Sequence, residues 1–98
     1  MKVPEKGCVL CAATWGDYWE EVEGQEMFFC CKVCADQFRN MLAELRRRTG
    51  WNEIDEIRIA GDHRGRICAA ISGDRQYEFF IKFGGGGTIQ TFMDLPRS

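Results

Sequence analysis

The sequence contains no long hydrophobic run. Its longest apolar segments are four or five residues, such as Ile67 to Ile71, whereas a membrane-spanning helix needs about 20 consecutive apolar residues. The first five residues also lack the apolar core of a secretory signal peptide. We therefore expect a protein without a membrane association that resides in the cytoplasm, where thiols stay reduced.

Histidine is almost absent as well. The one histidine, His63, falls in a predicted turn between two strands, beside Asp62 and Arg64. A catalytic zinc site needs an open coordination position and usually histidine or carboxylate ligands, and proton transfer near neutral pH depends mainly on histidine. No grouping of serine, histidine and acid stands out. We therefore predict that the protein is not an enzyme and that His63 is a solvated turn residue.

Cysteine, in contrast, is abundant: the chain has six, and five of them lie in the first 34 residues. In a reducing compartment, closely spaced cysteines bind a metal or take part in redox chemistry more often than they form disulfides. A structural zinc ion takes four ligands in a tetrahedron, usually thiolates. Cys8 and Cys11 form one C-x-x-C pair, and Cys30, Cys31 and Cys34 offer a second. We predict one zinc ion bound by four of these five.

The segments between and after the cysteines predict a hairpin and a helix. Residues 18–22 and 25–29 have the composition of short strands, joined by a Glu23-Gly24 turn. Apolar residues then recur at helical spacing from Val33 to Arg48, and Gly50 is the expected residue after the helix end. The apolar positions of this helix are Phe38, Met41, Leu42 and Leu45.

Beyond residue 50 the apolar pattern alternates instead, which predicts strands. They are expected at residues 54–60, 66–72, 76–83 and 88–93. Their short connections indicate an antiparallel meander. The four glycines at 84–87 lack the helix and the Lys-Ser/Thr of a phosphate-binding loop, so we expect a flexible hairpin loop there. Cys68 alternates with Ile67 and Ala69 and is expected to be a small buried residue.

The order of residues around the cysteines is specific. The Cys8 to Cys11 pair comes before an aromatic hairpin, and 21 residues separate Cys8 from Cys30. Phe28-Phe29-Cys30 is then followed by Cys34 and Phe38, each after three intervening residues. Over about residues 8–40, this order resembles the TRASH/YHS-type treble-clef zinc fingers.

The resemblance implies one ligand set, which is Cys8, Cys11, Cys30 and Cys34. Cys31 departs from the pattern, since the family often has a small polar residue there. Cys31 also forms a C-x-x-C pair with Cys34, so Cys31 stays the alternative to Cys30. The meander has no comparable motif. For the whole chain, membership in a small archaeal family of zinc proteins is a further expectation.

Together these patterns predict an α+β fold in a single domain of residues 1–98. Residues 1–50 would form a treble-clef-like zinc hairpin with its helix, and residues 51–98 an antiparallel β-meander. The apolar face of the helix needs a partner, and the sheet offers an apolar face of its own. We therefore expect the helix to pack on the meander.

The charge distribution weakly suggests nucleic acid. The net charge is −2, and the basic excess is concentrated in Arg64 and Arg66 and in Arg46 to Arg48, which lie in the last helical turn. We expect these cations to be solvated and to suit the helix dipole, although a phosphate-binding surface is the alternative. The tryptophans, Trp15, Trp19 and Trp51, are expected to pack in the core or the hairpin rather than to stack on bases.

We therefore predict a zinc-stabilised interaction module whose partner is a protein or a nucleic acid. A heavy-metal sensor or metallochaperone is one alternative, in which the spare thiol of Cys31 would favour soft ions such as Cu(I). A thiol-redox protein is another, and would need a reactive cysteine of low pKa and a reversible disulfide. The oligomeric state stays open at this point.

Overall fold

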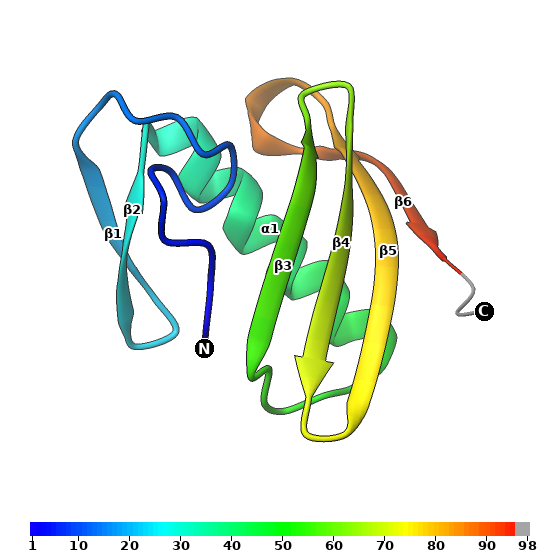
Figure 1. The fold of residues 1–98 in the computed structure, drawn as a ribbon. Coiled ribbons are helices and arrows are strands. Elements are labelled where there is room, and N and C mark those ends of the chain that lie inside the picture. Colours follow the sequence, from blue (N-terminus) through cyan, green and yellow to red (C-terminus); the bar gives the residue numbers. More distant parts are fainter. Residues whose placement is uncertain (96–98) are drawn as a thin grey trace.

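The computed structural model describes residues 1–95 and confirms the α+β class (Figure 1). One helix packs against two antiparallel sheets, of two and four strands. The elements are β1 (Tyr18–Val22), β2 (Gln25–Phe29), α1 (Lys32–Thr49), β3 (Glu56–Asp62), β4 (Gly65–Ser72), β5 (Arg75–Phe83), the 3-10 turn η1 (Gly85–Gly87) and β6 (Ile89–Asp94). Within residues 1–95, no helix is long and apolar enough to cross a membrane.

The small sheet is the predicted hairpin. Tyr18 pairs with Phe29 and Val22 with Gln25. Glu23 and Gly24 both have positive φ, 53° and 81°, as a two-residue hairpin turn that matches the strand twist requires. The ring of Phe29 lies 5.8 Å from that of Phe38 in α1, so the hairpin packs on the helix.

Helix α1 connects the two sheets. Its buried residues are Cys34, Ala35, Phe38, Met41, Leu42 and Leu45. Gly50 ends the helix in the left-handed conformation, with φ at 71°, and its N–H donates to the carbonyl of Arg46 at 2.7 Å. Figure 1 shows the N-terminal end of α1 beside β2 and the rest of the helix crossing behind β3 to β5. The cysteine-rich region and the large sheet are therefore positioned by one helix.

The large sheet is an antiparallel meander in the order β3-β4-β5-β6. Its core face includes Ile57, Cys68, Phe79 and Ile81, all at most 2% exposed. The first strand of this sheet begins at Glu56 instead of Ile54, and the Asp55 carboxylate just before it accepts from the Gly73 N–H at 2.6 Å. Lys2 forms a short parallel bridge with this strand.

The glycine loop differs from the flexible connection that the sequence predicted. Residues 85–87 form a 3-10 turn packed on α1. A side chain at Gly87 would meet the Cβ of Asp36 at 3.2 Å, and the Asn40 amide donates to the Gly87 carbonyl at 2.8 Å. This close approach, together with a φ of 83° at Gly87, explains why glycine suits that position.

Candidate metal centre

The first cysteine pair lies in a tight loop before β1. The Ala12 N–H donates to the Cys8 carbonyl at 2.8 Å, and the Cys8 N–H donates to the Ala13 carbonyl at 2.8 Å. Ala12 adopts a left-handed φ of 64° to close this turn. The Val9 N–H also bonds the Phe28 carbonyl at 3.0 Å, so the loop is fixed to the hairpin.

The second pair lies where β2 passes into α1. Cys30 directly follows the strand, and Cys34 lies in the first helical turn. The loop leading into β1 covers Cys30 closely, because a side chain at Gly16 would collide with the Cys30 carbonyl oxygen. This close approach leaves the Cys30 backbone little freedom to move.

The four sulfurs of Cys8, Cys11, Cys30 and Cys34 lie within 4.8 Å of one another. The Sγ distances are 3.6 Å between Cys11 and Cys30, 3.5 Å between Cys30 and Cys34, and 3.9 Å between Cys11 and Cys34. A tetrahedral zinc with bonds of about 2.3 Å places its sulfurs about 3.8 Å apart, whereas a disulfide needs about 2.0 Å. The arrangement can therefore hold one metal ion with four thiolate ligands.

The surroundings of these sulfurs shift their thiol pKa values in opposite directions. Burial raises the pKa of the Cys30 thiol to about 12, and burial also raises the pKa of Cys34. Burial acts in the same direction on Cys8, but the backbone N–H groups of Cys11 and Cys30 outweigh it and lower the pKa of the Cys8 thiol. A bound cation would replace the protons of such buried thiols, because metal-bound thiols are deprotonated.

Cys31 lies at the edge of this group. Its sulfur is 3.9 Å from that of Cys30, but it is not among the four that converge. Cys31 is the N-cap residue of α1, with an extended backbone. The pKa of the Cys31 thiol is lowered, mainly by the backbone N–H of Cys34. Burial acts in the opposite direction, and the backbone N–H of Val33 lowers the pKa further. Of the two adjacent cysteines, the geometry thus groups Cys30 with the other ligand candidates.

Comparison with known proteins identifies the family. The family model Ta0938 matches residues 5–95. The chain belongs to the Ta0938 family. No curated protein and no solved structure matches the chain. The family match extends over the cysteine-rich hairpin, the helix and the meander alike.

Other candidates in this Ta0938-family chain lie apart from the four sulfurs. Cys68 is 2% exposed on the core face of β4, where burial raises its pKa to about 12. His63 is exposed in the turn between β3 and β4. Trp15 and Trp19 are 64% and 58% exposed, so the expectation of core or hairpin packing is wrong for Trp15, while Trp19 packs on Phe28 across the hairpin.

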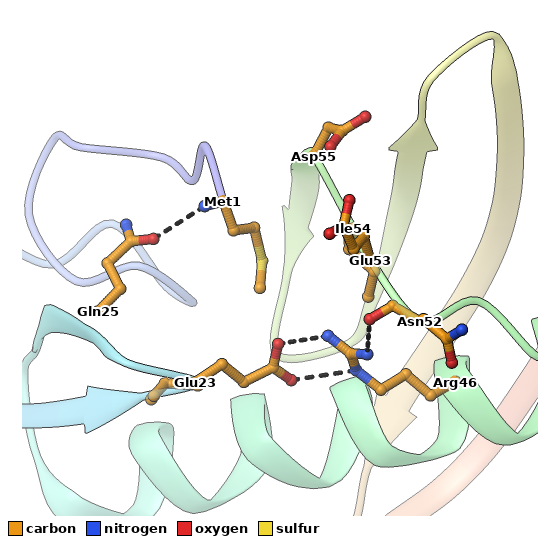
Figure 2. A pocket seen from close by; sticks show the side chains of 9 residues that line it. Met1, Glu23, Gln25, Arg46, Asn52, Glu53, Ile54 and Asp55 are labelled. Carbon is orange, nitrogen blue, oxygen red and sulfur yellow. Dashed lines mark hydrogen bonds and ion pairs between the residues drawn. The ribbon is translucent and has the colours of Figure 1, made fainter.

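The basic helix end is neutralised by acids. Arg46 forms an ion pair with Glu23, Arg47 with Glu44, and Arg48 with Glu44 and Asp94. Figure 2 shows the Arg46 guanidinium between Glu23 and the Asn52 carbonyl, beside a pocket that also includes acidic side chains. These contacts leave little unpaired positive charge for phosphate at this end of α1.

Ala12 and Arg66 have structural places that the sequence did not indicate, and Arg66, a candidate for the basic surface, is buried instead. Ala12 closes the cysteine loop, and only its place one residue after a C-x-x-C pair indicates that role. Arg66 is 6% exposed, its Nε has no hydrogen-bond partner among the described residues, and its guanidinium lies 5.9 Å from the Phe83 ring centroid. An alternating strand pattern gives no signal for such a buried arginine.

Proposed function

We propose that this chain is a zinc-stabilised interaction module that binds one Zn²⁺ and acts through a partner rather than by catalysis. The proposal depends on the convergence of Cys8, Cys11, Cys30 and Cys34, whose sulfurs lie within 4.8 Å of one another. Four thiolates in a tetrahedron suit zinc, which forms closed structural sites with such ligands. When bound, the ion would link the loop before β1 to the start of α1 and supply folding free energy.

The resemblance to TRASH/YHS-type treble-clef fingers agrees with this proposal. A hairpin that leads into a helix, with ligands before the hairpin and at the helix start, is the arrangement that the resemblance implies. An all-thiolate site has no free coordination position for a substrate or water. Structural rather than catalytic zinc is therefore the better interpretation of this ligand set.

A protein partner fits the surface better than a nucleic acid. The arginines of the α1 end are paired with acids, and residues 1–30 contain two lysines against six acids. Nucleic-acid binding requires a cluster of unpaired cations, because phosphate contacts dominate its affinity. We therefore propose a protein partner, in a reducing cytoplasm that would keep the ligand thiols available.

Metal analysis combined with native mass spectrometry tests the zinc proposal. The purified chain should contain one zinc ion, and Cys34→Ser should lose it. Cys68→Ala is the matched control, because Cys68 is buried outside the cluster, and this variant should keep the metal. A folded, metal-free protein with these cysteines joined in disulfides would contradict the proposal and would favour the thiol-redox alternative.

A metal sensor or metallochaperone is the second candidate, and Cys31 favours it. Its sulfur lies 3.9 Å from that of Cys30, and Cys11 is exposed, so an incoming ion could meet thiols at the edge of the site. Under this alternative, Cys31→Ser should weaken Cu(I) binding about tenfold, the loss of one soft ligand, and leave the zinc content unchanged. Equal Cu(I) affinity in both proteins would exclude a role for Cys31 in exchange.

A further inference from the structure

The face of the large sheet opposite α1, called here the outer face, is open and contains an apolar row. Figure 1 shows α1 behind the sheet and no described element in front of it. Cross-strand pairing aligns one residue from each strand into an apolar row: Ala60, Ile67, Phe80 and Met93. Ile67 is 55% exposed and Met93 50% exposed. The row therefore presents apolar side chains on all four strands, with the large ones on β4, β5 and β6.

The side chains around the row extend this apolar surface. A Cβ at Gly65 would lie 2.5 Å from the ring of Phe80, so the Phe80 ring lies across β4. Ala69 and Ile71 follow Ile67 on the same face of β4 and are half-buried. An antiparallel sheet with a solvated face normally has polar residues there. A contiguous exposed apolar patch of this kind marks an interaction surface.

The charges on either side of the row form a pattern that can complement itself. On one side of the row, Arg58 lies on β3 and Glu78 on β5, and both pair with Ala69. On the other side lie Asp62, two residues beyond Ala60, and Lys82, two residues beyond Phe80. Each of these two strands thus has opposite charges at equal spacing on the two sides of the row.

We propose that the outer face is a self-association surface whose occupant is a second copy of this chain. A two-fold axis along the apolar row would place each strand antiparallel to itself in the partner. Phe80 would then meet the partner's Phe80, Glu78 the partner's Lys82, and Arg58 the partner's Asp62. Two-fold contacts of this isologous kind are the commonest in soluble oligomers.

The existing ion pairs of the outer face do not oppose this arrangement. Arg58 pairs with Glu56 and Asp62 with Arg64 within one chain. The arginine side chains of these pairs are 65% and 81% exposed, and exposed pairs contribute little free energy. They can exchange partners at small cost, whereas the apolar row gains by leaving water.

The size of the outer face sets the expected affinity. Four strands about 4.8 Å apart and about seven residues long cover roughly 19 by 23 Å. The area of this rectangle is well below the roughly 800 Å² that each partner buries in a standard protein interface. We therefore expect a dissociation constant in the micromolar range.

Sedimentation equilibrium of the metal-loaded chain, from low micromolar to near-millimolar concentration, tests the surface. The chain should form a concentration-dependent dimer, and Ile67→Lys should be a monomer throughout. Trp19→Lys is the matched control, because it changes an equally exposed apolar residue on β1, and it should still dimerise. A native chain that stays monomeric, or a dimer that Ile67→Lys does not weaken, overturns the proposal.

Charge reversal tests the predicted register with variants that keep the apolar row intact. Glu78→Lys alone would place a second cation opposite the partner's Lys82, and Lys82→Glu alone would place two acids together. Each should weaken the dimer about tenfold, since like charges at an interface are unfavourable. The double variant restores opposite charges and should recover the native dissociation constant. A double variant as weak as the single variants overturns the self-facing arrangement.

Discussion

At the scale of single residues, Ala12 is a strained position in the cysteine loop. Its φ of 64° is left-handed, which costs an L-residue about 1–2 kcal/mol, more than the entropy that glycine loses on folding. Ala12→Gly should therefore raise the free energy of unfolding by about 0.5–1 kcal/mol, measured by urea denaturation of the zinc-loaded protein. Ala13→Gly, at a neighbour without positive φ, should lower it instead. A loss of stability in both variants would contradict the interpretation.

The sequence singled out the same four cysteines whose sulfurs converge in the structure, because their type and spacing are themselves the chemical signal. Two cysteine pairs separated by a hairpin can approach one point only if the hairpin folds back, and it does. Spacing could not separate Cys30 from Cys31, since adjacent residues can reach similar places. The backbone distinguishes them: Cys31 is extended at the helix N-cap, while the loop around Gly16 packs on Cys30. Such contacts depend on the fold.

At the scale of elements, Arg46 joins three segments. Its guanidinium forms an ion pair with Glu23 in the β1–β2 turn, and its Nη1 donates to the Asn52 carbonyl at 2.6 Å (Figure 2). Arg46→Met keeps much of the aliphatic packing but removes these bonds, and should cost about 1–2 kcal/mol of unfolding free energy.

Arg46→Lys is the matched control, because lysine keeps the charge but cannot bond both groups with a planar fork. We expect an intermediate loss, measured by thermal and urea denaturation. If the lysine variant is as stable as the native chain, charge alone explains the role of Arg46.

Tyr77 links the last two strands and should make stability depend on alkaline pH. Burial and its hydrogen bond to Asp94 raise the pKa of Tyr77 to about 12, from an ordinary value of 10. Because the folded pKa is the higher one, this contribution is fully present below pH 10 and is lost as the pH rises to 12. Tyr77→Phe should make the unfolding free energy fall less steeply over this pH interval. Urea denaturation at several pH values measures this slope. An unchanged slope would exclude Tyr77 as its source.

Element types were predictable, but some of their surroundings were not. The spacing of apolar residues predicted the helix and the strands, but not the 3-10 turn η1. In β4, however, Ile67 and Ala69 are as apolar as Cys68 and Ala70, so alternation alone does not show which face meets α1. The glycine run by itself predicted a flexible loop. Its packing on Asp36 and Asn40 depends on residues far away in the chain, which the local sequence does not show.

At the scale of the whole molecule, the metal centre should control the stability of both sheets. The candidate ligand Cys34 is in α1, and the same helix buries Phe38 and Leu42 in the common core. Removing the metal with a strong chelator should therefore lower the melting temperature and unfold hairpin and meander in one transition. Hydrogen exchange of the β4 and β5 amides, which report only on the large sheet, provides the measurement. Protected β4 and β5 amides after metal removal would show that the halves fold independently.

The bridge at Lys2 is a second link between the N-terminal half of the chain and the large sheet. The Lys2 N–H donates to the Asp55 carbonyl at 2.8 Å, and the Ile57 N–H donates to the Lys2 carbonyl at 2.9 Å. These two bonds close a ring of chain that contains the cysteine loop, the hairpin and the whole of α1. A mechanical load that separates the cysteine loop from the meander would stretch this ring and the helix packing together. Under force, the molecule should therefore yield in one step rather than release its two halves in turn.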